Sequence, residues 1–344
     1  MDARAALGRV VAGGTLTRAE AEATMTSVMT GEATPAQLGA LLAALAVRGE
    51  TVDEIAGFAA GMRAAATKVR LRSEAIDIVG TGGSRADPFN ISTVASIVVA
   101  AAGARVAKHG NRAASGRCGS ADVLEALGVR IDLGPEAIAD CVDEAGVAFM
   151  FAARFHQAMR HAAPVRREIG IRTVFNVLGP LANPAGVRRM VVGVATPGIG
   201  ETIARVLGEL GAEHALVVHG ADGLDELSPT GVSRTWELRG GTVREGTVDP
   251  AAVGLPYGAL ADLESGDAAA NAATARAVLG GEPGTRRNAV LLNAGAALLV
   301  AGVASDLRDG VARAAAAIDS GAATERLARF VAVSQRLGAA EAAS

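Results

Sequence analysis

The stretch AIDIVGTGGSRADPFNISTVASIVVAAAGARVAKHG, residues 75–110, determines which fold we expect. Its first six residues form a short apolar strand that runs into the glycine turn TGGS, and RVAKHG at 105–110 forms a second strand. Between them, NISTVASIVVAAAG at 90–103 is typical of a helix that begins near Ser92 and stops at Gly103. Because strand and helix alternate, we predict an α/β fold class with a mainly parallel central sheet.

The same alternation continues towards the C-terminus. It runs through the segments SADVLEALG (120–128), VRIDL (129–133), GPEAIADCVDEAG (134–146), VAFMF (147–151), RMVVGVAT (189–196), GIGETIARVLGELG (198–211) and HALVVHG (214–220), with VRIDL interpreted as a strand. VSRTWELRGGTVREG at 232–246 predicts a hairpin that turns at Gly240 and Gly241. The apolar run at 288–303 is too short to span a bilayer and predicts a buried helix.

The N-terminal residues show helical patterns only. Segments beginning at Thr17, Thr34 and Thr51 each place a capping residue before a helical run. The alternation is interrupted at 155–183, where a helical pattern is followed by a loop-rich stretch. We therefore expect two domains: a small helical domain, which also forms a dimer interface, made of 1–68 and 155–183, and a larger α/β domain made of 69–154 and 184–344.

The composition excludes several classes of protein. The chain has 344 residues and a net charge of −3, so it has no large positive field to hold a nucleic-acid backbone, and an anionic ligand needs a local site. Its two cysteines, Cys118 and Cys141, are far apart and belong to no Cys/His set, which argues against a disulfide scaffold and structural zinc. We expect a cytoplasmic protein without a signal peptide, a membrane partner or a nucleic-acid partner.

Three turns after predicted strands suit a phosphate. The glycine turn at 80–83 can bring backbone N–H groups close to a phosphate, although a tight turn alone explains it equally well. Asn90, Ser92 and Thr93 precede a helix whose free N–H groups attract anions, and the plainer interpretation is that they only cap it. Lys108 sits at the carboxyl end of the next strand and Ser120 starts the next helix, so both strand–turn–helix units aim at one crevice.

A pair of acids follows a third strand. Asp225 and Glu226 are adjacent in the glycine-rich turn HGADGLDEL. Mg²⁺ commonly takes one or two protein carboxylates together with substrate phosphates, so the pair is a candidate metal site, whereas in isolation it would be an acidic surface turn. Of Arg166 and Arg167, one facing the crevice would suit a carboxylate. The histidines at 156, 161, 214 and 219 are interpreted as structural, and Cys118 as an inert thiol.

Together these motifs resemble the anthranilate phosphoribosyltransferases, over residues 10–335. The matching segments are GTGG (80–83), FNIST (89–93), KHGNRAAS…GSADVLEALG (108–128), RHAAPVRREIGIRTVFNVLGPLANPAG (160–186) and HGADGLDEL (219–227). The resemblance implies an enzyme that joins anthranilate to phosphoribosyl pyrophosphate and releases pyrophosphate with the help of Mg²⁺. It also implies a helical domain, an α/β domain of the nucleoside phosphorylase and phosphoribosyltransferase type, and a homodimer formed through the helical domain.

Residue roles follow from the resemblance position by position. It implies that phosphoribosyl pyrophosphate is bound by Gly80, Thr81, Gly82, Gly83, Asn90, Ser92, Thr93, Lys108 and Ser120. It implies that anthranilate is bound by Gly80, His109, Asn111, Arg166, Gly179 and Pro180, with Arg166 on its carboxylate. Asp225 and Glu226 are implied to hold Mg²⁺ with the help of Ser92, and Lys108 acts with this acid pair in catalysis.

The loop at 84–88 departs from the family pattern. Where the family has Asp-Gly after GTGG, this chain has Ser84 and Arg85, and Pro88 lacks a backbone donor. We hypothesise an altered affinity for phosphoribosyl pyrophosphate, to which Arg85 contributes a charge. Two alternatives remain open: a pyrimidine-nucleoside phosphorylase, which shares the Lys-x-x-Asn-Arg pattern, and a non-catalytic paralogue that binds nucleic acid.

Overall fold

The computed structural model describes residues 1–84, 88–113 and 117–343. Its N-terminal part is a helical bundle made of α1 (Ala3–Val11), α2 (Arg18–Met29), α3 (Pro35–Arg48) and α4 (Val52–Ala65). Thr17, Thr34 and Thr51 cap α2, α3 and α4, each in a reciprocal pair of hydrogen bonds with the Glu or Gln three residues later. These three predicted helix starts are confirmed.

A seven-stranded sheet forms the centre of the molecule, in the order β3-β2-β1-β4-β5-β6-β7. Its strands are β1 (Ile76–Gly80), β2 (Val106–Gly110), β3 (Val147–Phe151), β4 (Arg189–Gly193), β5 (His214–His219), β6 (Ser233–Arg239) and β7 (Thr242–Val248). The first five strands of the order pair in parallel, whereas β6 and β7 are antiparallel. The sheet is therefore mainly parallel, as predicted, and its hairpin turns at Gly240 and Gly241, whose φ angles are +56° and +77°.

The predicted strand at 129–133 is wrong. β2 pairs directly with β3, so no position between these two consecutive strands is open to this segment, and β3 forms the edge of the sheet. Val129, Ile131 and Leu133 are buried, which explains the alternating pattern. The segment packs its apolar side chains against helices instead, and the Arg130 N–H donates to the Ser334 hydroxyl rather than to a strand.

Helices cover the sheet. They are α5 (Ile91–Ala101), α6 (Ser120–Leu127), α7 (Pro135–Ala145), α11 (Gly200–Glu209), α12 (Ala268–Leu279), α13 (Thr285–Val300), α14 (Leu307–Asp319) and α15 (Ala322–Ala343). α13 is the buried helix predicted near 288–303, and it packs against α5 and α14. In the described part of the chain, none of the helices combines the length and the apolar character needed to cross a bilayer.

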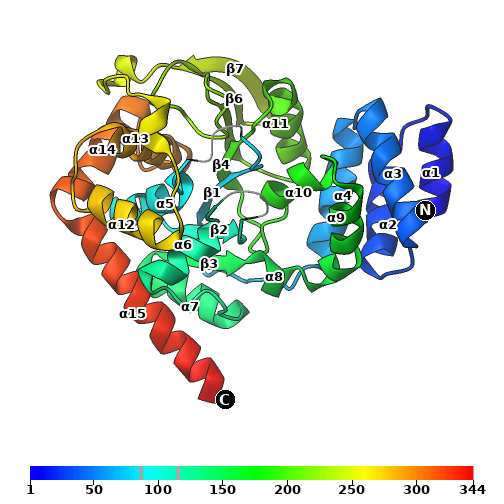
Figure 1. Cartoon of the computed structure of the whole chain (residues 1–344), viewed down its shortest axis with the longest axis horizontal. Coiled ribbons are helices and arrows are strands. Elements are labelled where there is room, and N and C mark those ends of the chain that lie inside the picture. Colours follow the sequence, from blue (N-terminus) through cyan, green and yellow to red (C-terminus); the bar gives the residue numbers. More distant parts are fainter. Residues whose placement is uncertain (85–87, 114–116, 344) are drawn as a thin grey trace.

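The interruption of the alternation brings the chain back towards the bundle. It contains α8 (Ala152–Phe155), the 3₁₀ helix η1 (Gln157–His161), α9 (Ala163–Ile169) and α10 (Phe175–Leu181). α9 contacts α3, η1 contacts α2 and α10 contacts α4, and Figure 1 shows α9 beside the bundle, opposite the C-terminal helices. These contacts support a discontinuous helical domain, whose boundaries stay a prediction. The expectation of a loop-rich stretch after residue 170 misses α10.

Candidate active site

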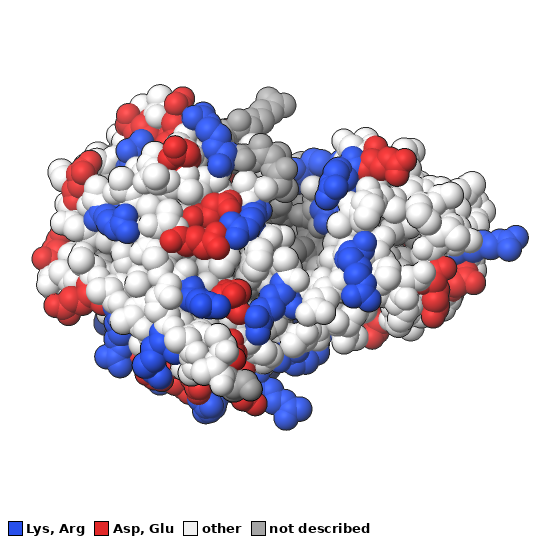
Figure 2. All heavy atoms as spheres, turned by 60° about the horizontal axis from the view of Figure 1, so that its bottom comes forward, with Lys and Arg blue, Asp and Glu red and all other residues white. Residues whose placement is uncertain are grey.

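Two cavities of about 570 Å³ each open at the carboxyl ends of β1 and β2. The polar cavity is lined by the glycine turn, the start of α5, Lys108 and the acid pair Asp225–Glu226. The apolar cavity is lined by His109, His156, Arg166, Phe175 and other residues of 152–180. The cavities share wall residues, namely Val79, Gly80, Thr81, His109, Gly110, Asn111 and Asn176. Figure 2 shows a hollow between the two parts of the molecule, with basic side chains on both sides.

The residues expected at the two substrates lie in these two cavities. All nine residues assigned to phosphoribosyl pyrophosphate line the polar cavity, and so do both acids. All six residues assigned to anthranilate line the apolar cavity. The structure thus brings together segments that are far apart in the sequence, and the individual roles of these residues stay predictions.

The acid pair is held by the glycine turn. Asp225 and Glu226 lie in the turn after β5, which Gly223 allows to form with a φ of +86°. The Gly82 N–H donates to Asp225 Oδ2 at 2.7 Å, and the Leu227 N–H donates to Asn293 Oδ1 at 2.9 Å. The Asp225 carboxylate is therefore fixed by the glycine turn, and the main chain that follows Glu226 is held by Asn293.

The electrostatics of the pair suit a divalent cation. Burial, followed by repulsion from Asp225, raises the pKa of Glu226 to about 8, and Lys108 and hydrogen bonds from Ser92 offset only part of this effect. Two carboxylates with too little positive charge around them accept Mg²⁺ readily. Within the described ranges, no group of three or more His, Cys, Asp or Glu side chains is placed to hold a metal. Asp225, Glu226 and the Ser92 hydroxyl are the residues that fit a magnesium ion shared with substrate phosphates.

Lys108 lies under the polar cavity. Its side chain is 3% exposed, and its Nζ donates to the Ile78 carbonyl and, at 3.2 Å, to Ser92 Oγ. Burial lowers the pKa of Lys108, while the negative charges of Asp77 and Glu226 oppose that shift. The ammonium group is thus aimed between β1 and the N-terminus of α5, where it can meet an anion.

The start of α5 differs from a simple cap. Asn90 makes no capping hydrogen bond; its Nδ2 donates to the Cys118 carbonyl and its Oδ1 accepts from Asn271, both at 3.0 Å. Thr93 is 2% exposed, and its Oγ1 has no hydrogen-bond partner among the residues that the structure describes. A buried hydroxyl without a partner beside a polar cavity favours a ligand over a purely structural role.

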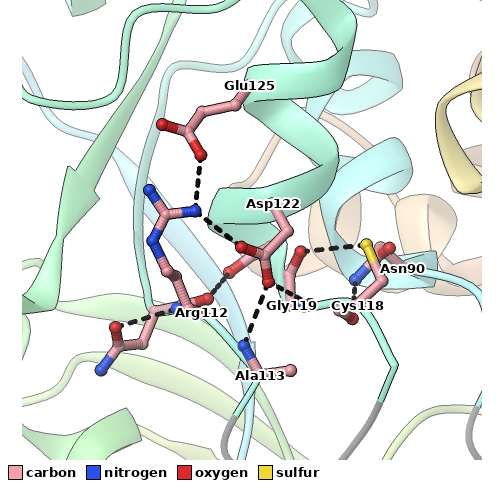
Figure 3. Close-up of polar contacts among 9 residues, drawn as sticks. Asn90, Arg112, Ala113, Cys118, Gly119, Asp122 and Glu125 are labelled. Carbon is pink, nitrogen blue, oxygen red and sulfur yellow. Dashed lines mark hydrogen bonds and ion pairs between the residues drawn. The ribbon is translucent and has the colours of Figure 1, made fainter. Parts of the chain in front are cut away.

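Backbone N–H groups just before α6 already have hydrogen-bond acceptors within the protein. Asp122 accepts from the N–H groups of Gly119, at 2.9 Å, and Ala113, at 3.2 Å (Figure 3). Arg112 donates to Asp122 at 2.7 Å and to Glu125 at 2.5 Å, so its charge is turned towards α6. Ser120 donates its hydroxyl to the Asn111 carbonyl at 3.2 Å. Arg112 therefore organises this loop, and Lys108 is the better placed cation.

The apolar cavity holds two neutral imidazoles. The His109 and His156 rings are 5.0 Å apart, and burial lowers the pKa of His109 to about 3 and that of His156 to about 4. Their Nε2 atoms are buried and find no hydrogen-bond partner within the described ranges. His156 was expected to be structural, and its place beside His109 follows from the fold of 152–161. His214 and His219 instead hydrogen-bond to Glu237 and Val194 on neighbouring strands.

The structure places Arg166, Arg167 and Arg172 in three different environments. Arg166 lines the apolar cavity with its guanidinium 5.1 Å from the centre of the Phe175 ring, and burial lowers its pKa. Arg167 is exposed and lines neither cavity. Arg172, which sequence reasoning did not single out, lines the polar cavity and donates to the Gly82 carbonyl at 3.4 Å. A side chain at position 83 would collide with this guanidinium, because an added Cβ would lie 1.8 Å from its Nη1.

The unusual loop is only partly described. Ser84 and Pro88 line the polar cavity, and Pro88 forms a bridge with Glu264. Arg85, to which we assigned a charge effect, lies outside the described residues, as do residues 86 and 87.

Comparison with known families matches both parts of the chain. Residues 4–66 match the helical bundle domain of a glycosyl transferase family, and residues 72–324 match the a/b domain of that family. Fold and site thus define a glycosyltransferase built from these two domains.

An anthranilate phosphoribosyltransferase of Thermomicrobium roseum is 57% identical over 343 residues, covering 98% of this chain and 99% of the relative. One from Moorella thermoacetica is 54% identical, covering 96% and 97%. The chain belongs to the anthranilate phosphoribosyltransferase family.

Solved structures of anthranilate phosphoribosyltransferases have the same fold as this chain. An anthranilate phosphoribosyltransferase from Thermus thermophilus has a TM-score of 0.92 and 46% identity, with 97% of this chain and all of that chain covered. The yeast enzyme in complex with PRPP and Mg has a TM-score of 0.89 at 24% identity, which shows a shared fold. The family assignment also favours a transferase over the phosphorylase and the nucleic-acid-binding paralogue that the motifs left open.

Proposed function

We propose that this enzyme transfers the 5-phosphoribosyl group of phosphoribosyl pyrophosphate to the amine of anthranilate, in a reaction that depends on Mg²⁺. The products are N-(5-phosphoribosyl)anthranilate and pyrophosphate, and the reaction is the second step of tryptophan biosynthesis from chorismate. One observation carries the proposal: a polar cavity with an acid pair and an apolar cavity with an arginine meet at shared wall residues. Two unlike substrates bound there would face each other.

The polar cavity suits the donor. Breaking the bond between the ribose and the pyrophosphate builds negative charge on the leaving group, and groups already aimed at that charge lower the barrier. One wall of this cavity is formed by Lys108, Thr93 and the N-terminus of α5. Arg172 lines another wall, next to the glycine turn. Asp225, Glu226 and Ser92 would hold Mg²⁺, which when bound neutralises phosphate charge.

The apolar cavity suits the acceptor. Arg166 can pair with the anthranilate carboxylate, and the adjacent Phe175 ring and Pro180 offer apolar contact to its ring. His109 and His156 also border this cavity, and their buried Nε2 atoms have no hydrogen-bond partner among the described residues. The reaction needs no strong base, because the neutral amine of anthranilate can attack the ribose carbon with its lone pair. Alignment of the two substrates can supply roughly 7–11 kcal/mol of the barrier.

Anthranilate fluorescence provides the test. Purified protein is mixed with anthranilate and phosphoribosyl pyrophosphate, with Mg²⁺ and with chelator in its place. We expect a loss of fluorescence that requires the donor and the metal. No loss at saturating substrates would contradict the proposal, and nucleosides with phosphate, followed by nucleic acid, would then be tested as ligands.

We also propose a homodimer formed through the helical domain and a cytoplasmic location. Val11 and Val47, on α1 and α3, are 70% and 89% exposed and supply apolar surface on the helical domain that a partner would cover. In the described part of the chain Cys141 is a free thiol, which agrees with a reducing compartment. Light scattering of the wild type and of a Val47→Glu variant tests the dimer: we expect a dimer and a monomer respectively, and a monomeric wild type would contradict it.

A further inference from the structure

A fully buried carboxylate lies beneath the site. Asp77, in β1, is 0% exposed and contributes to the wall of neither cavity. Its Oδ1 accepts from the His109 N–H at 3.2 Å, and its Oδ2 accepts from Asn183 Nδ2 at 2.8 Å. Asp77 therefore touches the main chain of one residue of the apolar cavity and the turn that follows α10.

Asn183 completes this contact. It is 2% exposed, and its Nδ2 also donates to the Ala107 carbonyl at 3.0 Å, while its Oδ1 accepts from the Ala185 N–H at 2.8 Å. One amide thus connects β1, β2 and the turn after α10. Each side-chain hydrogen-bonding atom of Asn183 is engaged, so its orientation is well determined.

These contacts reach the apolar cavity through His109. The His109 main chain is held by Asp77, and its ring Nδ1 lies 3.3 Å from the Gly179 carbonyl of α10. α10 supplies one wall of the cavity with Phe175, Asn176 and Gly179, and the ends of β1 and β2 supply the opposite wall. Asp77 and Asn183 therefore link the two walls from below.

Stability alone does not account for a carboxylate at this position. Burial, as the largest effect, raises the pKa of Asp77 to about 6, and Lys108 on β2 opposes it. The other titratable group that faces it, His109, is neutral near pH 7 because burial lowers its pKa. Buried charged groups are often no more stabilising than apolar ones of the same size, and in some proteins they serve to specify a geometry instead.

We propose that Asp77 and Asn183 are a pair of positioning residues that sets the distance between His109 and α10, and so shapes the site for the acceptor rather than for the donor. This inference rests on the proposed function, because it takes the apolar cavity as the anthranilate site. The pair acts through His109 and Gly179 and touches no substrate itself.

Kinetics of Asn183→Ala and Asp77→Asn test the proposal. The first removes the link and leaves the charge. The second places an amide nitrogen against the Asn183 amide, so that two donors face each other. For both we expect KM for anthranilate to rise about tenfold. In Asn183→Ala, KM for phosphoribosyl pyrophosphate should stay within about twofold of wild type, whereas Asp77→Asn also removes a negative charge that acts on Lys108 and is not held to that limit. Ser334→Ala is the control, since it removes an equally buried hydrogen bond far from both cavities.

A second readout does not depend on turnover. NMR of protein with labelled histidines reports the Nδ1–H of His109; we expect this signal to shift in both variants, while those of His214 and His219 stay in place. Equal changes in the two KM values of Asn183→Ala, or an unmoved His109 signal, would overturn the proposal. A wild type that does not consume anthranilate would instead overturn the proposed function, and the His109 signal would still show whether the pair positions that ring.

Discussion

Gly82 and Asp225 are 143 residues apart in the chain, yet the Gly82 N–H donates to Asp225 Oδ2 at 2.7 Å. This bond joins the glycine turn after β1 to the acid turn after β5. The Gly82 carbonyl in turn accepts from Arg172. Three separate segments therefore form one rigid edge of the polar cavity, and a disturbance in any of them reaches the acid pair.

Gly80→Ala should disturb that edge. A Cβ at position 80 would lie 2.3 Å from Asp225 Oδ2, so the acid must move. Because a misplacement of about 1 Å can cost about 10²-fold in rate, we expect kcat/KM for phosphoribosyl pyrophosphate to fall about 100-fold in steady-state assays. At the control position Gly198 an added Cβ meets nothing within 4 Å, and Gly198→Ala should be as active as wild type. Equal activity of both variants would show that the acid turn tolerates the shift.

Arg172→Ala should weaken binding of the donor. Its guanidinium lines the polar cavity, whereas Arg167 lines neither cavity and serves as a matched control. Loss of one charge-assisted contact to a phosphate is expected to cost about 1.5–3 kcal/mol, so KM for phosphoribosyl pyrophosphate should rise at least about tenfold, with KM for anthranilate nearly unchanged. Arg167→Ala should leave both constants unchanged. A rise in the anthranilate constant alone would place Arg172 at the other substrate.

Asp77→Asn should change how stability depends on pH. The pKa of Asp77 in the folded protein, about 6, is above the value of about 3.9 for an unfolded chain. The folded state therefore binds the proton more tightly, and wild type gains stability relative to the variant as pH falls through 6. Between pH 7.5 and pH 5 we expect the difference in unfolding free energy to shift by about 1 kcal/mol in favour of wild type, measured by urea denaturation. A difference that is the same at both pH values would contradict this.

Glu54→Gln should destabilise the helical bundle. The Glu54 side chain is fully buried, pairs with Arg48 and accepts from the N–H groups of Leu16 and Thr51, both at 2.9 Å. Burial acts to raise the pKa of Glu54, but these partners outweigh it and hold that pKa below its ordinary value. We expect a loss of about 3 kcal/mol at pH 7 in chemical denaturation, because Arg48 loses its partner. This stability is present at neutral pH and is lost as the carboxylate is protonated in acid. The exposed Glu32 provides the control, and a similar loss in Glu32→Gln would contradict the role of burial.

Local patterns were sufficient for most of the elements. The helix starts at Thr17, Thr34 and Thr51 depend on hydrogen bonds within three residues, so the sequence reveals them directly. The strand predicted at 129–133 fails for the opposite reason. Its alternation reflects real burial, but a strand also needs a neighbour, and β3 already occupies that place beside β2.

The residues of the candidate site also fall into two groups: those that local sequence patterns reveal and those that only the tertiary structure brings together. By itself the sequence determined which short motifs carry phosphate-binding and acidic groups, because glycine turns, helix starts and adjacent carboxylates are local features. Only the tertiary structure decided that Arg172 joins the glycine turn, that His156 faces His109, and that Asp77 and Asn183, 106 residues apart, share a hydrogen bond beneath the apolar cavity. These residues act through contacts between distant segments, which the packing of α10 and the order of the strands create and which no local spacing encodes.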